Sequence, residues 1–238
     1  MGKEMKEKNW ELAQKALEAG ATRLLLWGPP GVGKSRWALG VLAAGRQHPP
    51  VRVYLNQDLT AQELLGHWIP RGREFQWHHG PVARAWLLGA GLVIDEVGRA
   101  SGAVLDLLLA VLDDPETARI TLPTGEEIRP QEGFSAVATS NAPPDSLDPA
   151  LVDRFDSIIH VPAPHPALIS RLDAELEGLG LVIQDSYADE ERAISPRRAL
   201  VFARFLRAGL GADEAARLAF GERAKDVLAA LRLGGGKA

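Results

Sequence analysis

The sequence predicts an α/β fold: a five-stranded parallel sheet with helices on both faces, followed by a small α-helical domain. Three observations lead to this prediction. Short apolar runs recur along the first part of the 238 residues, helical periodicities separate these runs, and only helical periodicities follow the proline-rich segment 162–166. We therefore expect an α/β domain over residues 1–162 and a helical lid domain over residues 163–238.

The expected strands are short apolar runs that end at a glycine, a proline or a polar residue. Continuous apolar runs are typical of strands that a parallel sheet buries on both faces, whereas strands exposed on one face alternate apolar and polar residues. We expect strands at 22–27, 51–56, 91–95, 134–141 and 157–162.

Apolar residues spaced three and four apart predict the helices. In the α/β domain these are 9–19, 34–44, 80–91 and a helix with Leu105, Leu108, Leu109 and Leu112 along one face. In the lid domain they are 166–177, 196–208 and 213–232. Two further segments interrupt the alternation: an insert at about 70–81 and a hairpin at about 117–133 that turns near Thr124 and Gly125.

Composition excludes several classes of protein. The chain has no cysteine, so it has neither disulfides nor a thiolate metal site. Its first residues are charged and lack the apolar core of a signal peptide, and no stretch approaches the ~20 apolar residues of a membrane span. We expect a cytoplasmic protein that does not contact a membrane. The net charge of −4 argues against a protein that coats nucleic acid, although it leaves room for a local basic groove.

A phosphate-binding loop follows the first expected strand. The pattern G-x-x-x-x-G-K-[ST] is satisfied by Gly28, Pro29, Pro30, Gly31, Val32, Gly33, Lys34 and Ser35, and a helix is expected directly after it. Glycines allow the backbone N–H groups to surround an anion, the lysine reaches the β- and γ-phosphates, and the serine hydroxyl completes a Mg²⁺ shell. The predicted cofactor-binding set also includes the next residue, Arg36.

Polar residues at later strand ends complete the predicted site. Asp95 and Glu96 follow an apolar strand, where the first can hold Mg²⁺ and the second can polarise an attacking water. Asn141 ends another strand and either holds that water or serves as an ordinary turn residue. Arg154 either forms an internal salt bridge or acts across a subunit boundary on a neighbour's γ-phosphate.

In this order, the four segments resemble the AAA+ ATPases. Walker A is GPPGVGKS, Walker B is LVIDE, sensor 1 is Asn141, and the arginine-finger segment is LVDRFD. More narrowly, the segments DLTAQELLG, HGPVARAWLLGAGLVIDEVGRA, ATSNAP and LDPALVDRFD resemble the MoxR-like ATPases of the dynein-related AAA subfamily. The resemblance covers about residues 20–162 well and the helical end loosely. Gly98 stands where the family usually has asparagine.

The resemblance implies ATP and Mg²⁺ as cofactors and a homo-oligomeric ring, typically a hexamer, with ATP between neighbouring subunits. Five residues would act in cis: Lys34, Ser35, Asp95, Glu96 and Asn141. Arg154 would act in trans. The segment SPRRAL resembles sensor 2, which points to Arg197, with Arg198 as a rival.

The target of the ATPase is left open between three classes. The resemblance favours remodelling or activation of a partner protein, such as a von Willebrand factor A-type protein. The alternatives are a nucleic-acid motor or loader and an ATP-dependent assembly switch. The 70–81 insert carries Phe75 and Trp77 beside Arg71 and Arg73, which suit gripping a polypeptide, stacking on single-stranded bases or packing onto the insert's own domain.

Overall fold

The computed structural model describes residues 2–100, 102–189 and 193–233. The chain divides into two compact units. The sheet unit comprises residues 11–27 and 34–160, and the helical unit comprises residues 1–10, 28–33 and 161–238.

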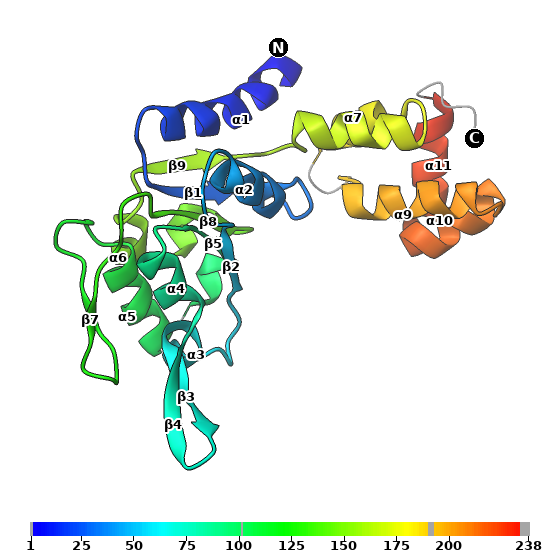
Figure 1. Cartoon of the computed structure of the whole chain (residues 1–238). Helices are drawn as coiled ribbons and strands as arrows, with labels where there is room; N and C mark the ends of the chain where they lie inside the picture. Colours follow the sequence, from blue (N-terminus) through cyan, green and yellow to red (C-terminus); the bar gives the residue numbers. More distant parts are fainter. Residues whose placement is uncertain (1, 101, 190–192, 234–238) are drawn as a thin grey trace. The chain divides into compact units, whose positions relative to one another are not determined.

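The sheet unit is built on a five-stranded parallel sheet in the order β2-β5-β8-β1-β9 (Figure 1). The predicted fold class is confirmed. In chain order the strands are β1 (Arg23–Trp27), β2 (Val51–Tyr54), β5 (Gly91–Asp95), β8 (Ser135–Ser140) and β9 (Ser157–His160). The three central strands are buried on both faces or nearly so, which agrees with their continuous apolar runs.

The two faces of the sheet are covered by different helices. Leu25, Ile94 and Ala138 face a core that also contains the buried residues of α3 (Ala61–Leu65), α4 (Pro81–Leu87) and α5 (Gly102–Val111). The opposite face packs against α2 (Lys34–Ala43). Close approach on this side explains Gly91, because a Cβ there would lie 2.7 Å from the Cβ of Leu42.

Short helices and two hairpins complete the sheet unit. A capping box between Thr60 and Glu63 begins α3, and Asp148 caps α6 (Pro149–Val152) by accepting two backbone N–H bonds. A proline at the first helical position begins α4 and α6. The antiparallel hairpins are β3 (Gly66–Arg71) with β4 (Glu74–His79), and β6 (Ile120–Thr121) with β7 (Glu127–Ile128).

The helical unit contains α7 (Pro166–Glu175), α8 (Leu179–Ser186), α9 (Pro196–Arg207), α10 (Ala212–Phe220) and α11 (Ala224–Leu233). The single helix predicted over 213–232 is wrong, because Gly221 adopts φ +61° and a 3₁₀ turn separates α10 from α11. Helix α8 was not predicted. Phe202 of α9 and Phe220 of α10 pack with ring centroids 5.5 Å apart.

Helix α1 (Gly2–Glu18) crosses the division between the units. Within the helical unit, the indole Nε1 of Trp10 donates a hydrogen bond of 3.1 Å to the carbonyl of Ala163, and the ring meets His165 edge to face. Among the described residues, none of the helices combines the length and apolar character that crossing a membrane requires.

Candidate active site

The candidate site of the sheet unit lies where several parallel strands end. Asp95 is the last residue of β5, Asn141 follows β8, and Lys34 and Ser35 begin α2. Carboxyl ends of parallel strands meet at one edge of a sheet, which is the usual ligand position in such folds. The structure therefore brings together five residues that the sequence predicted for the site: Lys34, Ser35, Asp95, Glu96 and Asn141.

Asn141 bridges a cation and an anion. Lys34 Nζ donates a hydrogen bond of 2.9 Å to Asn141 Oδ1, and Asn141 Nδ2 donates one of 2.6 Å to Glu96 Oε1. Lys34 is buried, and desolvation lowers its pKa to about 8 although the negative charges of Glu96 and Asp95 act in the opposite direction. A cation buried at this cost is well suited to an anionic ligand, because phosphate oxygens would compensate its charge.

Asp95 is buried and accepts three hydrogen bonds. Its Oδ1 accepts hydrogen bonds from Ser35 Oγ at 2.5 Å and from Thr139 Oγ1 at 2.9 Å. Its Oδ2 accepts one from Arg52 Nε at 2.5 Å. Sequence reasoning missed Thr139 and Arg52. For Thr139 a signal was available: it stands two residues before Asn141, on the strand face that carries the site.

Glu96 has an unusual backbone. Its φ of 59° and ψ of 47° are left-handed, a conformation that costs roughly 1–2 kcal/mol for a residue with a Cβ. The backbone N–H of Glu96 donates weakly to Thr139 Oγ1 at 3.4 Å, and Arg99 Nε lies 3.8 Å from the carboxylate. Such strain is often found at functional residues, where it fixes the direction of a side chain.

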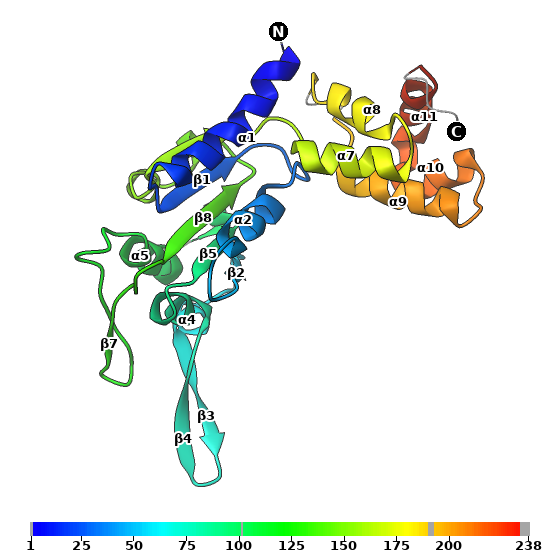
Figure 2. The ribbon, with the colours of Figure 1, turned by 45° about the horizontal axis from the view of Figure 1, so that its top comes forward.

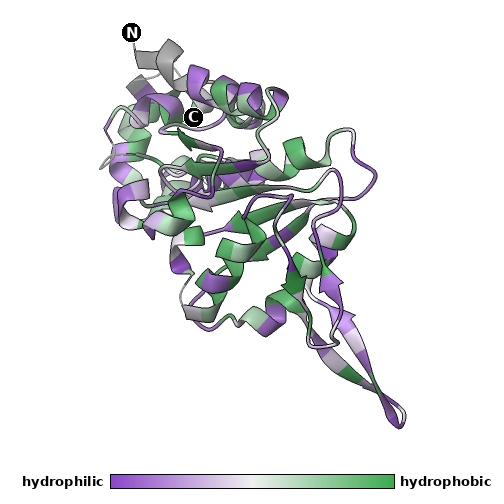
Figure 3. Ribbon diagram, turned by 90° about the vertical axis from the view of Figure 1, so that its left-hand side faces the viewer, coloured by the Kyte–Doolittle hydropathy of each residue, from purple (hydrophilic) through white to green (hydrophobic). Residues whose placement is uncertain are grey.

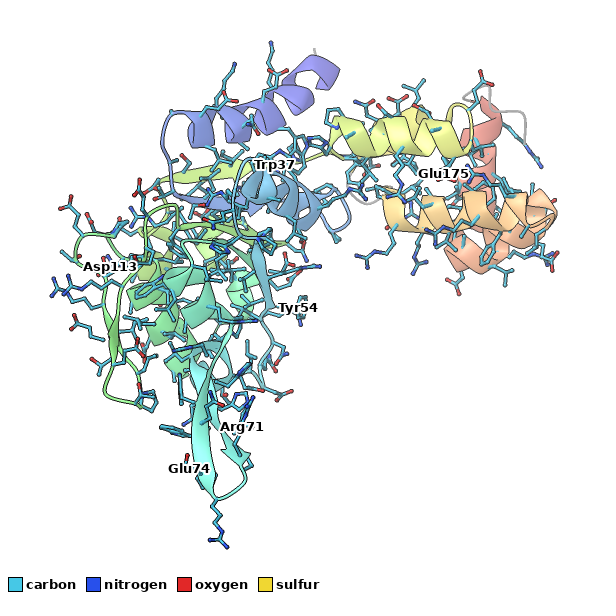
Figure 4. All side chains as sticks on the ribbon, in the orientation of Figure 1. Trp37, Tyr54, Arg71, Glu74, Asp113 and Glu175 are labelled. Carbon is cyan, nitrogen blue, oxygen red and sulfur yellow. The ribbon has the colours of Figure 1, made fainter. Side chains whose placement is uncertain are left out.

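Arg154 has a different partner. It follows α6, and its Nη1 lies 3.2 Å from Oδ1 of Asp113, just beyond α5. Both side chains are more than a third exposed, and the buried Arg154 Nε has no hydrogen-bond partner among the described residues. Figure 4 labels Asp113 at this part of the sheet unit. The structure thus shows the internal salt bridge that was one of the two readings of Arg154.

The glycine-rich loop belongs to the helical unit, and three of its glycines have positive φ: 146° at Gly28, 84° at Gly31 and 109° at Gly33. A Cβ on Gly28 would lie 2.4 Å from the carbonyl oxygen of Val161, so no larger residue fits there. This backbone is one that only glycine adopts easily, and glycine-rich turns of this kind are known to direct N–H groups toward anions.

Backbone carbonyls of the loop also accept hydrogen bonds from other residues of the helical unit. The Val32 carbonyl accepts from the backbone N–H of His165 at 2.9 Å, and the Pro30 carbonyl lies 3.5 Å from the hydroxyl of Tyr187. Burial raises the pKa of Tyr187 to about 12, so this hydroxyl stays protonated and can donate at any physiological pH. Pro29 is half-buried and Arg36, in α2 of the sheet unit, is exposed.

The two rival arginines of the helical unit both stand in the first turn of α9, and both are exposed. Arg198 lines a cavity of about 270 Å³ together with Ser195, Phe220 and Arg223, and Arg197 is not among its lining residues. The two neighbours therefore face different surroundings within this unit.

The donor set suits a nucleotide with its magnesium ion. A buried carboxylate paired with a serine hydroxyl supplies the hard oxygen ligands that Mg²⁺ prefers. The buried Lys34 supplies a cation that suits phosphate oxygens. Ser35 and Asp95 would hold the ion, and their hydrogen bond already places both oxygens side by side.

Comparison with known proteins gives the family. The family model for the AAA domain of the dynein-related subfamily matches residues 23–155. Protein NorQ of Paracoccus denitrificans is 31% identical over 208 residues, which cover 81% of this chain and 76% of NorQ. The denitrification regulatory protein NirQ of Stutzerimonas stutzeri is 26% identical over 215 residues, which cover 84% of this chain and 77% of NirQ.

Solved structures agree on the fold. A RuvB variant of Thermotoga maritima superimposes with a TM-score of 0.56 at 19% identity, covering 98% of this chain and 70% of the RuvB chain. The family model spans more than half of the chain, and NorQ matches most of its length. The chain therefore belongs to the dynein-related subfamily of AAA domains and is a MoxR-like member of the AAA+ ATPase family.

Proposed function

We propose that this protein hydrolyses ATP with Mg²⁺ in a ring of identical subunits and uses the energy to remodel or activate a partner protein. The observation that carries the proposal is the hydrogen-bonded cluster that joins Lys34, Asn141 and Glu96 beside the Ser35–Asp95 pair. These groups are the ones that phosphoryl transfer to water requires: a phosphate-binding cation, a metal-binding carboxylate, and a second carboxylate for the water.

Each residue has a role in the proposed reaction. Lys34 binds the β- and γ-phosphates. Glu96 orients the attacking water and accepts its proton, while Asn141 holds the Glu96 carboxylate in place through its amide. Bound Mg²⁺ supplies charge neutralisation at the phosphates, with Ser35 and Asp95 as its protein ligands.

The β3–β4 hairpin offers a surface for the partner. Its register pairs Trp68 with Trp77 and Pro70 with Phe75, so these four residues share one face. Phe75 is 69% exposed and Trp68 is 48% exposed. Figure 2 shows the hairpin extending beyond α4 within its unit, and the hydropathy colouring of Figure 3 shows green positions among the hydrophilic residues of the hairpin.

A protein partner suits this face better than a nucleic acid. Exposed aromatic anchors are typical of protein interfaces. Bases could also stack on such rings, but a single-strand groove needs an accompanying stripe of cations, and Glu74 stands opposite Arg71 near the end of the hairpin (Figure 4). The partner class that the MoxR resemblance implies is a von Willebrand factor A-type protein.

Replacement of Glu96 by glutamine tests both halves of the proposal. We expect Glu96→Gln to bind fluorescent ATP as the unchanged protein does but to release phosphate at least ~100-fold more slowly, because the amide cannot accept a proton. The matched control is Glu127→Gln, an exposed change in the β7 strand that should leave the rate unchanged.

The same variant identifies the target. Stalled with ATP, a tagged Glu96→Gln protein should retain its partner on affinity beads, and that partner should raise the phosphate-release rate of the unchanged protein. Unimpaired hydrolysis by Glu96→Gln would refute the catalytic assignment. Stimulation by single-stranded DNA, with none by any captured protein, would replace the remodelling proposal with the nucleic-acid motor.

A further inference from the structure

Arg52 places a positive charge directly on the carboxylate assigned to magnesium. Its Nε donates to Asp95 Oδ2 at 2.5 Å, and the Asp95 side chain is 3% exposed whereas that of Arg52 is 51% exposed. The parallel register pairs Arg52 with Val93 and Tyr54 with Asp95, so Arg52 and Asp95 lie on the same face, two residues apart along the strands. The pair thus joins a buried anion to a cation that reaches solvent.

The two oxygens of Asp95 have separate surroundings. Oδ1 accepts hydrogen bonds from the hydroxyls of Ser35 and Thr139, and Oδ2 accepts one from the guanidinium of Arg52. A buried carboxylate is strongly unfavourable without a compensating cation, and Arg52 supplies one. Mg²⁺ held by Ser35 and Asp95 would supply the same compensation from the Oδ1 side, so that the guanidinium is needed only while the metal is absent.

We propose that Arg52 is a positioning residue that neutralises Asp95 in the metal-free chain and competes with Mg²⁺ for this carboxylate. The inference rests on the proposed function, since it concerns the metal that accompanies ATP. Two cationic groups on one carboxylate repel each other, so Arg52 weakens metal binding and is released when the metal binds. Release costs little, because the exposed half of the side chain is already hydrated. An arginine stays charged at any accessible pH, so the competition does not depend on protonation of the guanidinium.

Mn²⁺ is a suitable probe because its binding to the protein–ADP complex is read by electron paramagnetic resonance. We expect Arg52→Gln to lower the Kd for Mn²⁺ by about tenfold, because the positive charge is removed while a hydrogen-bond donor remains. Arg52→Lys keeps the charge and should stay within about twofold of the unchanged protein. The matched control is Arg129→Gln, which removes an equally exposed arginine from an ion pair with Glu127 in the same unit and should change nothing.

The unchanged protein gives a second measurement that needs no folded variant. Phenylglyoxal modifies accessible guanidinium groups, and peptide mass spectrometry reports each site. The rate of modification of Arg52 should rise several-fold when Mg²⁺ is added to the ADP complex, while that of Arg129 stays constant. Thermal melting of Arg52→Gln confirms that any change in metal affinity arises in a folded protein.

The outcomes separate the two proposals. ADP binding in EDTA measures nucleotide binding without metal, and it should be unchanged in Arg52→Gln. If the unchanged protein binds no nucleotide, the proposed function fails and the competition fails with it. If nucleotide binds but the Kd for Mn²⁺ stays equal or rises in Arg52→Gln, or Mg²⁺ leaves the modification of Arg52 unaltered, the competition alone is overturned.

Discussion

Asp156 shows how much of the sheet unit depends on one carboxylate. It stands just before β9, and its Oδ2 accepts the backbone N–H groups of Thr22 and Arg23 at 2.8 and 2.9 Å. Its Oδ1 accepts Arg23 Nη2 at 2.7 Å, and Arg23 in turn donates to the Leu112 carbonyl. Asp156 therefore fixes the start of β1 beside β9 at one edge of the sheet.

The charge of Asp156 makes this contact depend on pH. Desolvation raises the pKa of Asp156, but the hydrogen bonds from Arg23 and Thr22 outweigh it, so the pKa lies below its usual value. A carboxyl group whose pKa is lower in the folded state stabilises the fold above its unfolded pKa, and this stabilisation is lost as the pH falls through the folded pKa.

We expect Asp156→Asn to lower the free energy of unfolding by about 1 kcal/mol at pH 7, since the pair is partly screened by solvent. At an acidic pH below the lowered pKa of folded Asp156, the variant and the unchanged protein should be equally stable, because Asp156 is then protonated. Urea unfolding at both pH values measures the difference. Asp145→Asn, an exposed change, is the control. A difference that persisted in acid would mean that shape, and not charge, makes the contribution.

Among the secondary-structure elements, the sheet was the most predictable part of this protein. Runs such as 92–94 are apolar because the sheet is covered on both faces, and the strand ends place Asp95 and Asn141 at one edge. Arg52 escaped notice because its role depends on the register between β2 and β5, which no local pattern records. Helix α8 escaped because it is only eight residues long and its N-cap, Gly178, has no side chain to mark the helix start.

The β3–β4 hairpin was also missed as a pair of strands. Pro70, Phe75 and both tryptophans lie on one face, but the other face places Ile69 among polar residues, so the polar–apolar alternation is incomplete. The Gly72 turn lies between two arginines. Because the hairpin is exposed, burial does not dictate its sequence. Where burial does not determine the residue type, the side chains of the hairpin can be suited to binding a partner.

Phe75→Ser tests this use of the hairpin. Since Phe75 is largely exposed, the free energy of unfolding should change by less than ~0.5 kcal/mol and the ATPase rate without partner should stay constant. The stimulation by a captured partner should fall by about tenfold, as expected for an aromatic anchor in an interface. Gln76→Ser, the exposed neighbour on the other face, is the control for both measurements.

The result separates binding from packing. A loss of stability in Phe75→Ser would show that the ring supports the fold, as in the third reading of the insert. Equal loss of stimulation in Phe75→Ser and Gln76→Ser would show that the aromatic face has no special part in partner binding.

At the level of the proposed assembly, we expect Arg154 to link one subunit's fold to the activity of the next. Its ion pair with Asp113 is more than a third exposed on both sides, and solvent-screened pairs of this kind contribute little to stability. The guanidinium can therefore leave Asp113 for a stronger partner, such as the γ-phosphate of a neighbouring subunit, at small cost. Closed rings are built from such heterologous contacts, in which each subunit gives one surface and receives another.

Mixing two inactive variants tests whether Arg154 acts across the boundary. Lys34→Ala lacks the phosphate-binding cation, and Arg154→Ala lacks the finger, so each alone should hydrolyse ATP roughly 10³-fold more slowly or worse. In an equal mixture, about one quarter of the interfaces combine an intact Lys34 with an intact Arg154 from the neighbour, and activity should return to that extent. Phosphate release after mixing measures it. If Arg154 acted within its own subunit, no mixed ring would contain a complete site, and the mixture would stay as inactive as its components.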